Sequence, residues 1–240
     1  MIDPYHSEIL QLIQNNSGTP TKHTFLDSYL GNDHPRYPIN APKLRSIAKT
    51  WMREHRELPV SAFSDMLTSL IKGKSATEKT MAGILMDYAT ADQRNFDPKL
   101  FDIWLDHLIG WAEVDAVCTG DYTIKQILLN WKKWKPLLLK FSKDKNIHKR
   151  RASLVLLCSP VSRVADAGMT EVALHNIEKL KSEKEVLITK AISWLLRSMV
   201  RHYKKTVSDY IKENKSTLPS IAVRETLTKL KTGKKTKTKM

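Results

Sequence analysis

The sequence predicts an all-α protein built from antiparallel helical pairs. Nearly every long segment carries apolar residues at the 3.6-residue period of a helix. Segments that alternate apolar and polar residues, as strands do, are scarce, and the 240 residues include only 8 glycines. We therefore expect helices along the whole chain.

The expected helices follow one another with short breaks between them. Asn95-Phe96-Asp97 precedes Pro98, which we place at a helix start because proline suits the first helical position. Asn146 is expected to open a later helix, since asparagine favours the position before the first turn. The periodic segments are 43–52, 62–71, 78–88, 98–109, 121–129, 134–141, 148–157, 170–179, 186–200, 206–213 and 221–231.

The spacing of these helices indicates a repeat architecture. Pairs recur about every 35–45 residues, the period of HEAT or armadillo repeats. We therefore expect a HEAT/armadillo-like α-solenoid with a concave basic groove, formed by one domain over residues 1–230. A compact helical bundle is the alternative, and it would have no such groove. Residues 231–240 are expected to form a Lys-rich tail, either solubilising or in contact with phosphates.

The composition points to an anionic partner. The chain has 40 Lys and Arg against 25 Asp and Glu, a formal net charge of +15, which favours nucleic acid first and an anionic membrane second. No apolar run is long enough to span a bilayer, and the first residues do not resemble a secretory signal. Cys118 and Cys158 exclude a disulfide framework and fit a reducing cytoplasm. No metal site or cofactor is expected, because neither ligand clusters nor glycine-rich phosphate loops are present.

A tryptophan and an aspartate lie one helical turn apart in Gly110-Trp-Ala-Glu-Val-Asp115. Residues four apart share a helix face, so Trp111 and Asp115 can point to the same place. A carboxylate beside an aromatic ring in a basic protein suits a cation that is held against a polyanion. Taken alone, however, Asp115 would more often pair with an arginine and Trp111 would more often be buried in a core.

Two basic segments follow. Arg150 and Arg151 precede an apolar stripe, which places one guanidinium near the inward face of the helix, and arginine binds phosphate with a forked donor set. Lys190, Trp194 and Arg197 share one helix face, where a ring flanked by cations suits a sugar-phosphate strand. Each pattern alone also fits a solvated basic helix face.

Several of these segments occur in the same order in one known family. They are Tyr37-Pro-Ile-Asn-Ala-Pro-Lys-Leu-Arg45, Trp111-x-x-Val114-Asp115, Arg151-Ala-Ser, Lys190-Ala-Ile-Ser-Trp194-Leu-Leu-Arg197 and Val223-Arg-Glu225. The chain, from about Phe25 to Leu230, resembles the AlkD-type DNA alkylation repair glycosylases, which are built from HEAT-like repeats. It departs from their pattern at His148, where tryptophan is common, and at Ile39-Asn40.

The resemblance implies a role for each matching residue. Asp115 would be the catalytic carboxylate, and Trp111 and Trp194 would hold the deoxyribose of the lesion. Arg151 and Arg197 would bind the DNA backbone, with Arg150 and Lys190 beside them. It also implies a monomer that leaves the damaged base exposed rather than flipping it into a pocket.

The sequence therefore supports two hypotheses of different kinds. The first is a monofunctional glycosylase that removes N3- and N7-alkylated purines from duplex DNA, in the cytoplasm and associated with the nucleoid. The second is a non-catalytic HEAT-repeat protein that binds DNA structure or a protein partner. An RNA-binding repeat protein is disfavoured, because no base-reading code recurs along the chain.

Overall fold

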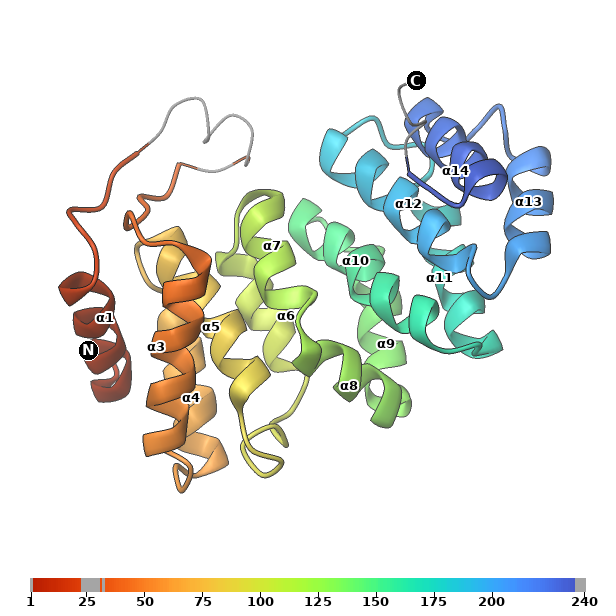
Figure 1. Ribbon diagram of the computed structural model, residues 1–240. Coiled ribbons are helices and arrows are strands. Elements are labelled where there is room, and N and C mark those ends of the chain that lie inside the picture. Colours follow the sequence, from red (N-terminus) through yellow and green to blue (C-terminus); the bar gives the residue numbers. More distant parts are fainter. Residues whose placement is uncertain (1, 23–30, 32, 236–240) are drawn as a thin grey trace. The chain divides into compact units, whose positions relative to one another are not determined.

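The computed structural model describes residues 2–22, 31 and 33–235, and its regular structure is helical (Figure 1). Thr21 and Arg36 form an isolated antiparallel bridge. The all-α helical repeat fold that the sequence predicts is confirmed. In order, the elements are α1 (Pro4–Asn15), α3 (Ala41–Glu54), α4 (Val60–Ile71), α5 (Ala76–Tyr88), α6 (Leu100–Trp104), the 3₁₀ helix η1 (Leu105–His107), α7 (Gly110–Cys118), α8 (Asp121–Leu129), α9 (Trp131–Phe141), α10 (Ile147–Arg163), α11 (Ala167–Leu180), α12 (Val186–Met199), α13 (Lys204–Glu213) and α14 (Ser220–Thr232).

One expected helix is wrong in extent. Residues 98–109 were predicted as a single helix, but α6 begins at Leu100 and the 3₁₀ turn η1 ends at His107. The Asp97 carboxylate accepts the Lys99 N–H at 2.9 Å, so residues 97–99 form a turn instead of the first helical residues. After η1, Leu108 and Ile109 are extended, because the next helix begins at Gly110. The entry into α7 therefore ends the preceding helix early.

The chain divides into two compact units, which are described separately. We call Met1–Thr123 the N-terminal unit and Ile124–Met240 the C-terminal unit. The single domain over residues 1–230 and the concave basic groove stay predictions. The expected tail at 231–240 begins inside α14, which continues to Thr232, and its last five residues lie outside the described part of the chain.

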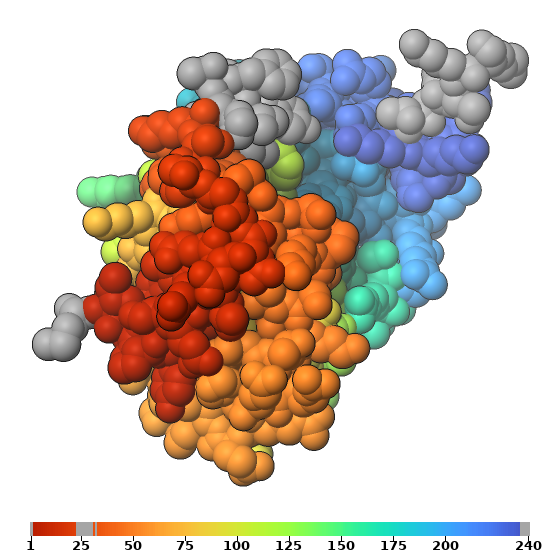
Figure 2. Space-filling view, turned by 60° about the vertical axis from the view of Figure 1, so that its left-hand side comes forward, coloured from red at the N-terminus to blue at the C-terminus, as the bar shows by residue number. Residues whose placement is uncertain are grey.

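In the N-terminal unit, the helices form two rows. One row is α3, α5 and α7, each packed against the next, while α4 packs on α5, α6 and α1. Figure 2 shows one face of this unit, where α1 (red) lies against α3 and α4 (orange). Its core is rich in aromatic rings: Phe63, Phe101 and Trp104 are each fully buried. The Trp104 indole N–H donates to the Thr68 hydroxyl at 2.8 Å and so joins α6 to α4.

The C-terminal unit repeats the two-row plan. Helices α10, α12 and α14 pack one against the next, and α9 and α11 form a second row behind α10. The buried face of α12 is mainly apolar, with Ile188, Ile192, Leu195, Leu196 and Met199 at 0% exposure. Asn176 is also fully buried, and its side-chain amide donates to the carbonyls of Leu138 and Ser153. Helix α11 is thereby tied to both α9 and α10.

Two further findings concern the described residues only. No helix among them has the length and hydrophobicity needed to cross a bilayer. No group of three or more His, Cys, Asp or Glu side chains in this part of the chain has the arrangement that holds a metal ion.

Candidate functional site

A buried glutamate sets the start of α7 in the N-terminal unit. Glu113 is 1% exposed, and its Oε2 accepts the Ile109 N–H at 2.8 Å. Its Oε1 lies 2.7 Å from Nδ1 of His34, which belongs to the segment leading into α3. Gly110, between Ile109 and the helix, has a φ of +72°, a conformation that favours glycine. The first turn of α7 is thus held by a carboxylate that is almost completely removed from solvent.

A buried lysine balances this carboxylate. Lys79 of α5 is 2% exposed, and its Nζ donates to the Gly73 carbonyl at 2.5 Å. Burial lowers the pKa of Lys79, whereas the negative charges of Glu113 and Glu78 act to raise it. The three charges therefore depend on one another, and α5 and α7 share one electrostatic network.

The same two helices approach backbone to backbone at Gly83. A Cβ atom at this position would lie 2.1 Å from the Ala116 carbonyl oxygen of α7. Only glycine permits such an approach without moving one helix. The position of α7 is therefore set both by packing and by charge.

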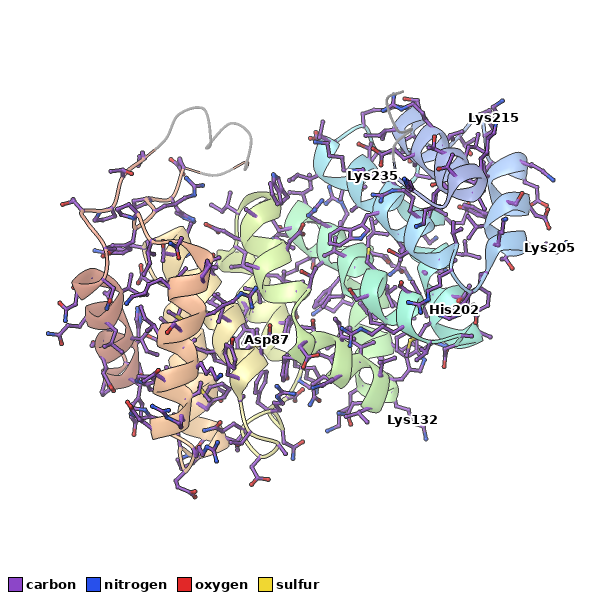
Figure 3. The ribbon with its side chains drawn as sticks, in the orientation of Figure 1. Asp87, Lys132, His202, Lys205, Lys215 and Lys235 are labelled. Atoms are coloured by element: carbon purple, nitrogen blue, oxygen red, sulfur yellow. The ribbon has the colours of Figure 1, made fainter. Side chains whose placement is uncertain are left out.

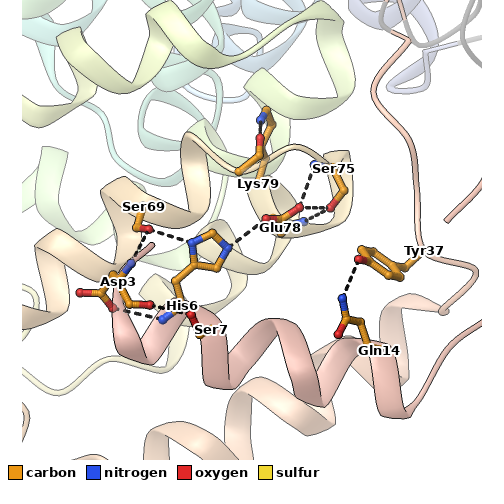
Figure 4. Close-up of polar contacts among 10 residues, drawn as sticks. Asp3, His6, Ser7, Gln14, Tyr37, Ser69, Ser75, Glu78 and Lys79 are labelled. Carbon is orange, nitrogen blue, oxygen red and sulfur yellow. Dashed lines mark hydrogen bonds and ion pairs between the residues drawn. The ribbon is translucent and has the colours of Figure 1, made fainter. Parts of the chain in front are cut away.

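A second polar network holds α1 on the rest of the N-terminal unit (Figure 4). His6 is 2% exposed, with Nε2 lying 2.9 Å from Glu78 and Nδ1 lying 2.8 Å from the Ser69 hydroxyl. Glu78 also accepts the Ser75 N–H and hydroxyl in a capping box that opens α5. Burial alone would raise the pKa of Glu78, but hydrogen bonds from His6 and Ser75 outweigh it, and the pKa is lowered. These contacts support α5, on which α7 rests.

Trp111 and Asp115 lie on the half-buried face of α7. Both side chains are partly exposed, while Val114, Val117 and Cys118 on the other face are buried. The shared face follows from their spacing, as the sequence predicts. Both residues take part in further interactions, and the Asp115 carbonyl accepts the Thr119 hydroxyl at 2.7 Å. The half-buried ring of Trp111 differs from the buried core position that a lone tryptophan would suggest.

Asp87 is another half-buried carboxylate of this unit, and sequence reasoning did not single it out (Figure 3). Burial raises its pKa, while a 2.9 Å hydrogen bond from the Tyr122 N–H acts in the opposite direction. Because that N–H belongs to the first turn of α8, Asp87 acts as a cap for this helix. A structural role accounts for its position.

The two arginines at the start of α10 have different surroundings in the C-terminal unit. Asn146 caps the helix by accepting the His148 N–H, as predicted. Arg151 is 5% exposed and donates to the Leu187 carbonyl in the first turn of α12, so it is the inward arginine that the sequence predicts. Arg150 donates to both carboxylate oxygens of Glu183, at 2.8 and 3.2 Å, and to two backbone carbonyls. A DNA contact by Arg150 stays a prediction, and it would compete with Glu183.

His148 occupies the position at which the resembled family often has tryptophan. Its Nδ1 is buried and has no hydrogen-bond partner among the described residues. Burial lowers its pKa, and the charges of Arg151 and Arg150 lower it further. His148 is therefore a neutral ring beside two arginines, with the shape of an aromatic side chain and without an added charge.

Helix α12 carries the third group of predicted residues. Lys190 is exposed, Trp194 is half-buried, and Arg197 has a side chain that is 15% exposed. Glu225 of α14 holds Arg197, because its Oε2 lies 3.3 Å from Nε and also accepts the buried Ser193 hydroxyl at 2.7 Å. Sequence reasoning missed the pairing role of Ser193 and Glu225. The sequence identified Glu225 only as part of the segment Val223-Arg-Glu225. Its pairing with Ser193 could not be predicted, because 32 residues separate the two partners.

The predicted residues thus fall into two groups. Trp111 and Asp115 share a face in the N-terminal unit, while Arg150, Arg151, Lys190, Trp194 and Arg197 lie on adjacent helices of the C-terminal unit. That the two groups form one site stays a prediction. The carboxylate and ring of the N-terminal unit are suited to a cationic sugar, and the cations of the C-terminal unit are suited to a phosphate.

Comparison with known proteins identifies the family of the chain. No curated protein sequence matches the chain significantly. Among solved structures, the fold is similar to that of a protein described as "Predicted DNA alkylation repair enzyme from Enterococcus faecalis", with a TM-score of 0.69 and 18% identity over 85% of this chain and 92% of that one. At this identity the likeness concerns the fold. The sequence profile of a family described as DNA alkylation repair enzyme matches residues 10–230. Because this match covers most of the chain, the protein belongs to the DNA alkylation repair enzyme family, which supports a role in DNA repair.

Proposed function

We propose that the protein is a monofunctional DNA glycosylase that hydrolyses the N-glycosidic bond of N3- and N7-alkylated purines in duplex DNA. The observation that carries the proposal is the pair on α7: a partly exposed carboxylate, Asp115, one turn from the partly exposed ring of Trp111. The network of Glu113 and Lys79 holds this helix in place. Family membership supports alkylated DNA as the substrate.

The chemistry needs only one acidic group. Alkylation at N3 or N7 gives the purine a positive charge, so the base leaves as a neutral molecule with the electrons of the bond to C1′. The sugar becomes an oxocarbenium-like cation, which a fixed carboxylate at Asp115 stabilises. A water molecule then bonds to C1′, and the proton that it loses passes to the surrounding solvent. The electron-rich indole face of Trp111 adds to the stabilisation of the cation.

The cations of the C-terminal unit would bind the DNA strand. Arg151 and Arg197 have guanidinium groups that buried contacts orient, and Lys190 lies on the same helix as Arg197. An oriented guanidinium loses little entropy when it binds a phosphate. A repair enzyme of this kind acts on the genome, so we expect a monomeric, cytoplasmic protein that associates with the nucleoid.

The test is direct measurement of the released base. The purified protein is incubated with methylated duplex DNA, and free N3-methyladenine and N7-methylguanine are measured by mass. Asp115→Asn should keep duplex binding and lose excision by on the order of a hundredfold or more. Asp92→Asn removes the same charge at an exposed position before α6 and should leave excision unchanged.

Two outcomes would contradict the proposal. Full excision by Asp115→Asn would remove the assigned catalytic group. No release by the wild-type protein, with salt-sensitive duplex binding intact, would instead identify a non-catalytic DNA-binding member of the family.

A further inference from the structure

A basic cavity lies between the ends of α12 and α14 in the C-terminal unit. Its volume is about 510 Å³, and none of the described residues that line it is acidic. Four of its lining residues are cations, namely Arg197, Arg201, Lys229 and Lys235, and the ring of Trp194 forms another part of the wall. The cavity therefore extends well beyond Trp194 and Arg197, the two residues that sequence reasoning singled out here.

The C-terminal end of the described chain completes this cavity. Helix α14 ends at Thr232 and is capped by Gly233, whose φ of +71° turns the backbone, and Lys229 donates to the Gly233 carbonyl at 2.5 Å. The turn brings Lys235 to 3.9 Å from Glu225, next to α12 and α14 (Figure 3). Gly233 and Lys235, which follow α14, are thus part of a defined basic surface.

The charges of the cavity do not cancel. Glu225 is the carboxylate that holds both Arg197 and Lys235, and it does not itself line the cavity. One negative charge against four positive charges leaves an excess of three. Among the described residues, Arg197 makes its hydrogen bond and ion pair through Nε. The N–H groups of its two terminal nitrogens therefore remain available as donors. Such donors beside lysines match the oxygens of a phosphate.

We propose that this cavity, which we call the α12–α14 pocket, binds a backbone phosphate of the DNA strand. The phosphate would lie on Arg201 and Lys229, with the terminal nitrogens of Arg197 as further donors. The half-buried Trp194 ring packs against the adjoining sugar. The inference rests on the proposed function only in taking DNA as the partner, and it makes the end of α14 a DNA-binding element.

The salt dependence of duplex binding tests this pocket. In an Asp115→Asn background, the double variant Arg201→Gln/Lys229→Gln is titrated with an undamaged duplex over a range of salt concentrations. Loss of one phosphate contact reduces the magnitude of the negative slope of log K, the binding constant, against log salt concentration by about 1. It also weakens binding about threefold to tenfold. Arg201 is exposed and Lys229 is half-buried at the surface, so the fold should persist, as an unchanged unfolding midpoint would show.

A matched control removes equal charge elsewhere in the same unit. Lys205 and Lys215 are exposed and lie away from Lys235 in Figure 3, and Lys205→Gln/Lys215→Gln should keep the wild-type slope. In addition, Ser198→Glu places a negative charge in the pocket and should weaken binding more than the double variant. Equal slopes for the pocket variant and the control, with no effect of Ser198→Glu, would overturn the proposal.

Competition separates the sources of the phosphate. Undamaged single strands and inorganic phosphate are added against the labelled duplex, and the proposal expects the strands to compete far better than the free ion. Competition by inorganic phosphate at similar concentrations would overturn the assignment to a DNA backbone. Because these readouts use binding to undamaged DNA, their failure is distinct from a failure of base excision.

Discussion

The two units hold their functional helices by different means. In the N-terminal unit, α7 depends on the buried charges of Glu113 and Lys79, and the Glu113 carboxylate also accepts a hydrogen bond from His34. In the C-terminal unit, α12 is held by an apolar face, and its ion pair with Glu225 lies at the edge. Apolar packing tolerates the loss of one polar contact, whereas a buried charge network does not. The proposed catalytic helix should therefore be the more fragile of the two.

The largest expected effect comes from breaking the network of the N-terminal unit. Glu113→Ala leaves the Ile109 N–H and His34 without their acceptor and removes the negative charge near buried Lys79. We expect the free energy of unfolding to fall by about 3 kcal/mol, measured by chemical denaturation.

A conservative replacement sharpens this result. Glu113→Gln keeps a side-chain oxygen at the start of α7 and should lose less stability than the alanine variant. A loss below about 0.5 kcal/mol in Glu113→Ala would show that the network does not hold α7.

The close approach of α5 and α7 gives the next largest effect. Gly83→Ala puts a Cβ atom 2.1 Å from the Ala116 carbonyl, so one helix must move. We expect a loss of about 1–3 kcal/mol in the free energy of unfolding. Excision should fall more than duplex binding, because α7 carries Asp115.

A glycine of the C-terminal unit serves as the control. A Cβ atom at Gly168 in α11 would meet its nearest neighbour, the Asp166 side chain, at 3.4 Å, which is ordinary contact. Gly168→Ala should therefore be neutral or slightly stabilising. If the two glycine variants had the same free energy of unfolding, the close approach of α5 and α7 would not affect stability.

The edge contact of α12 should have a smaller effect. Ser193→Ala removes the hydroxyl that donates to Glu225 at 2.7 Å, while the apolar face of α12 stays intact. We expect a loss of about 1 kcal/mol in the free energy of unfolding. The guanidinium of Arg197 also loses a neighbour, so duplex binding should weaken while the rate of base excision in the bound state holds. A change in that rate with binding unaltered would contradict the assignment of Ser193 as a positioning residue.

These residues also show how far sequence reasoning extends in this protein. Helical periodicity and the Asn146 cap are local signals, and they predicted the fold class and the place of α10. The face shared by Trp111 and Asp115 follows from spacing alone. The Ser193–Glu225 pair and the α12–α14 pocket could not be predicted, because they join helices whose packing no local pattern encodes. The early end of the helix before α7 was also missed, although its signals are local: Gly110 has a positive φ, and the Glu113 carboxylate accepts the N–H of Ile109, four residues before it.

The smallest effect concerns the pH dependence of stability in the C-terminal unit. Burial and the nearby arginines lower the pKa of His148 below its ordinary value of 6.5. The unfolded chain therefore binds a proton at this residue more readily than the folded one, and His148 makes the protein less stable as the pH falls below 6.5. His148→Phe removes this contribution along with the buried, unpaired Nδ1. The unfolding free energy of His148→Phe minus that of the wild type should increase as the pH is lowered from 7 toward 5. If the unfolding free energies of the two proteins changed with pH in the same way, then neither burial nor the arginines at the start of α10 would shift the pKa of His148.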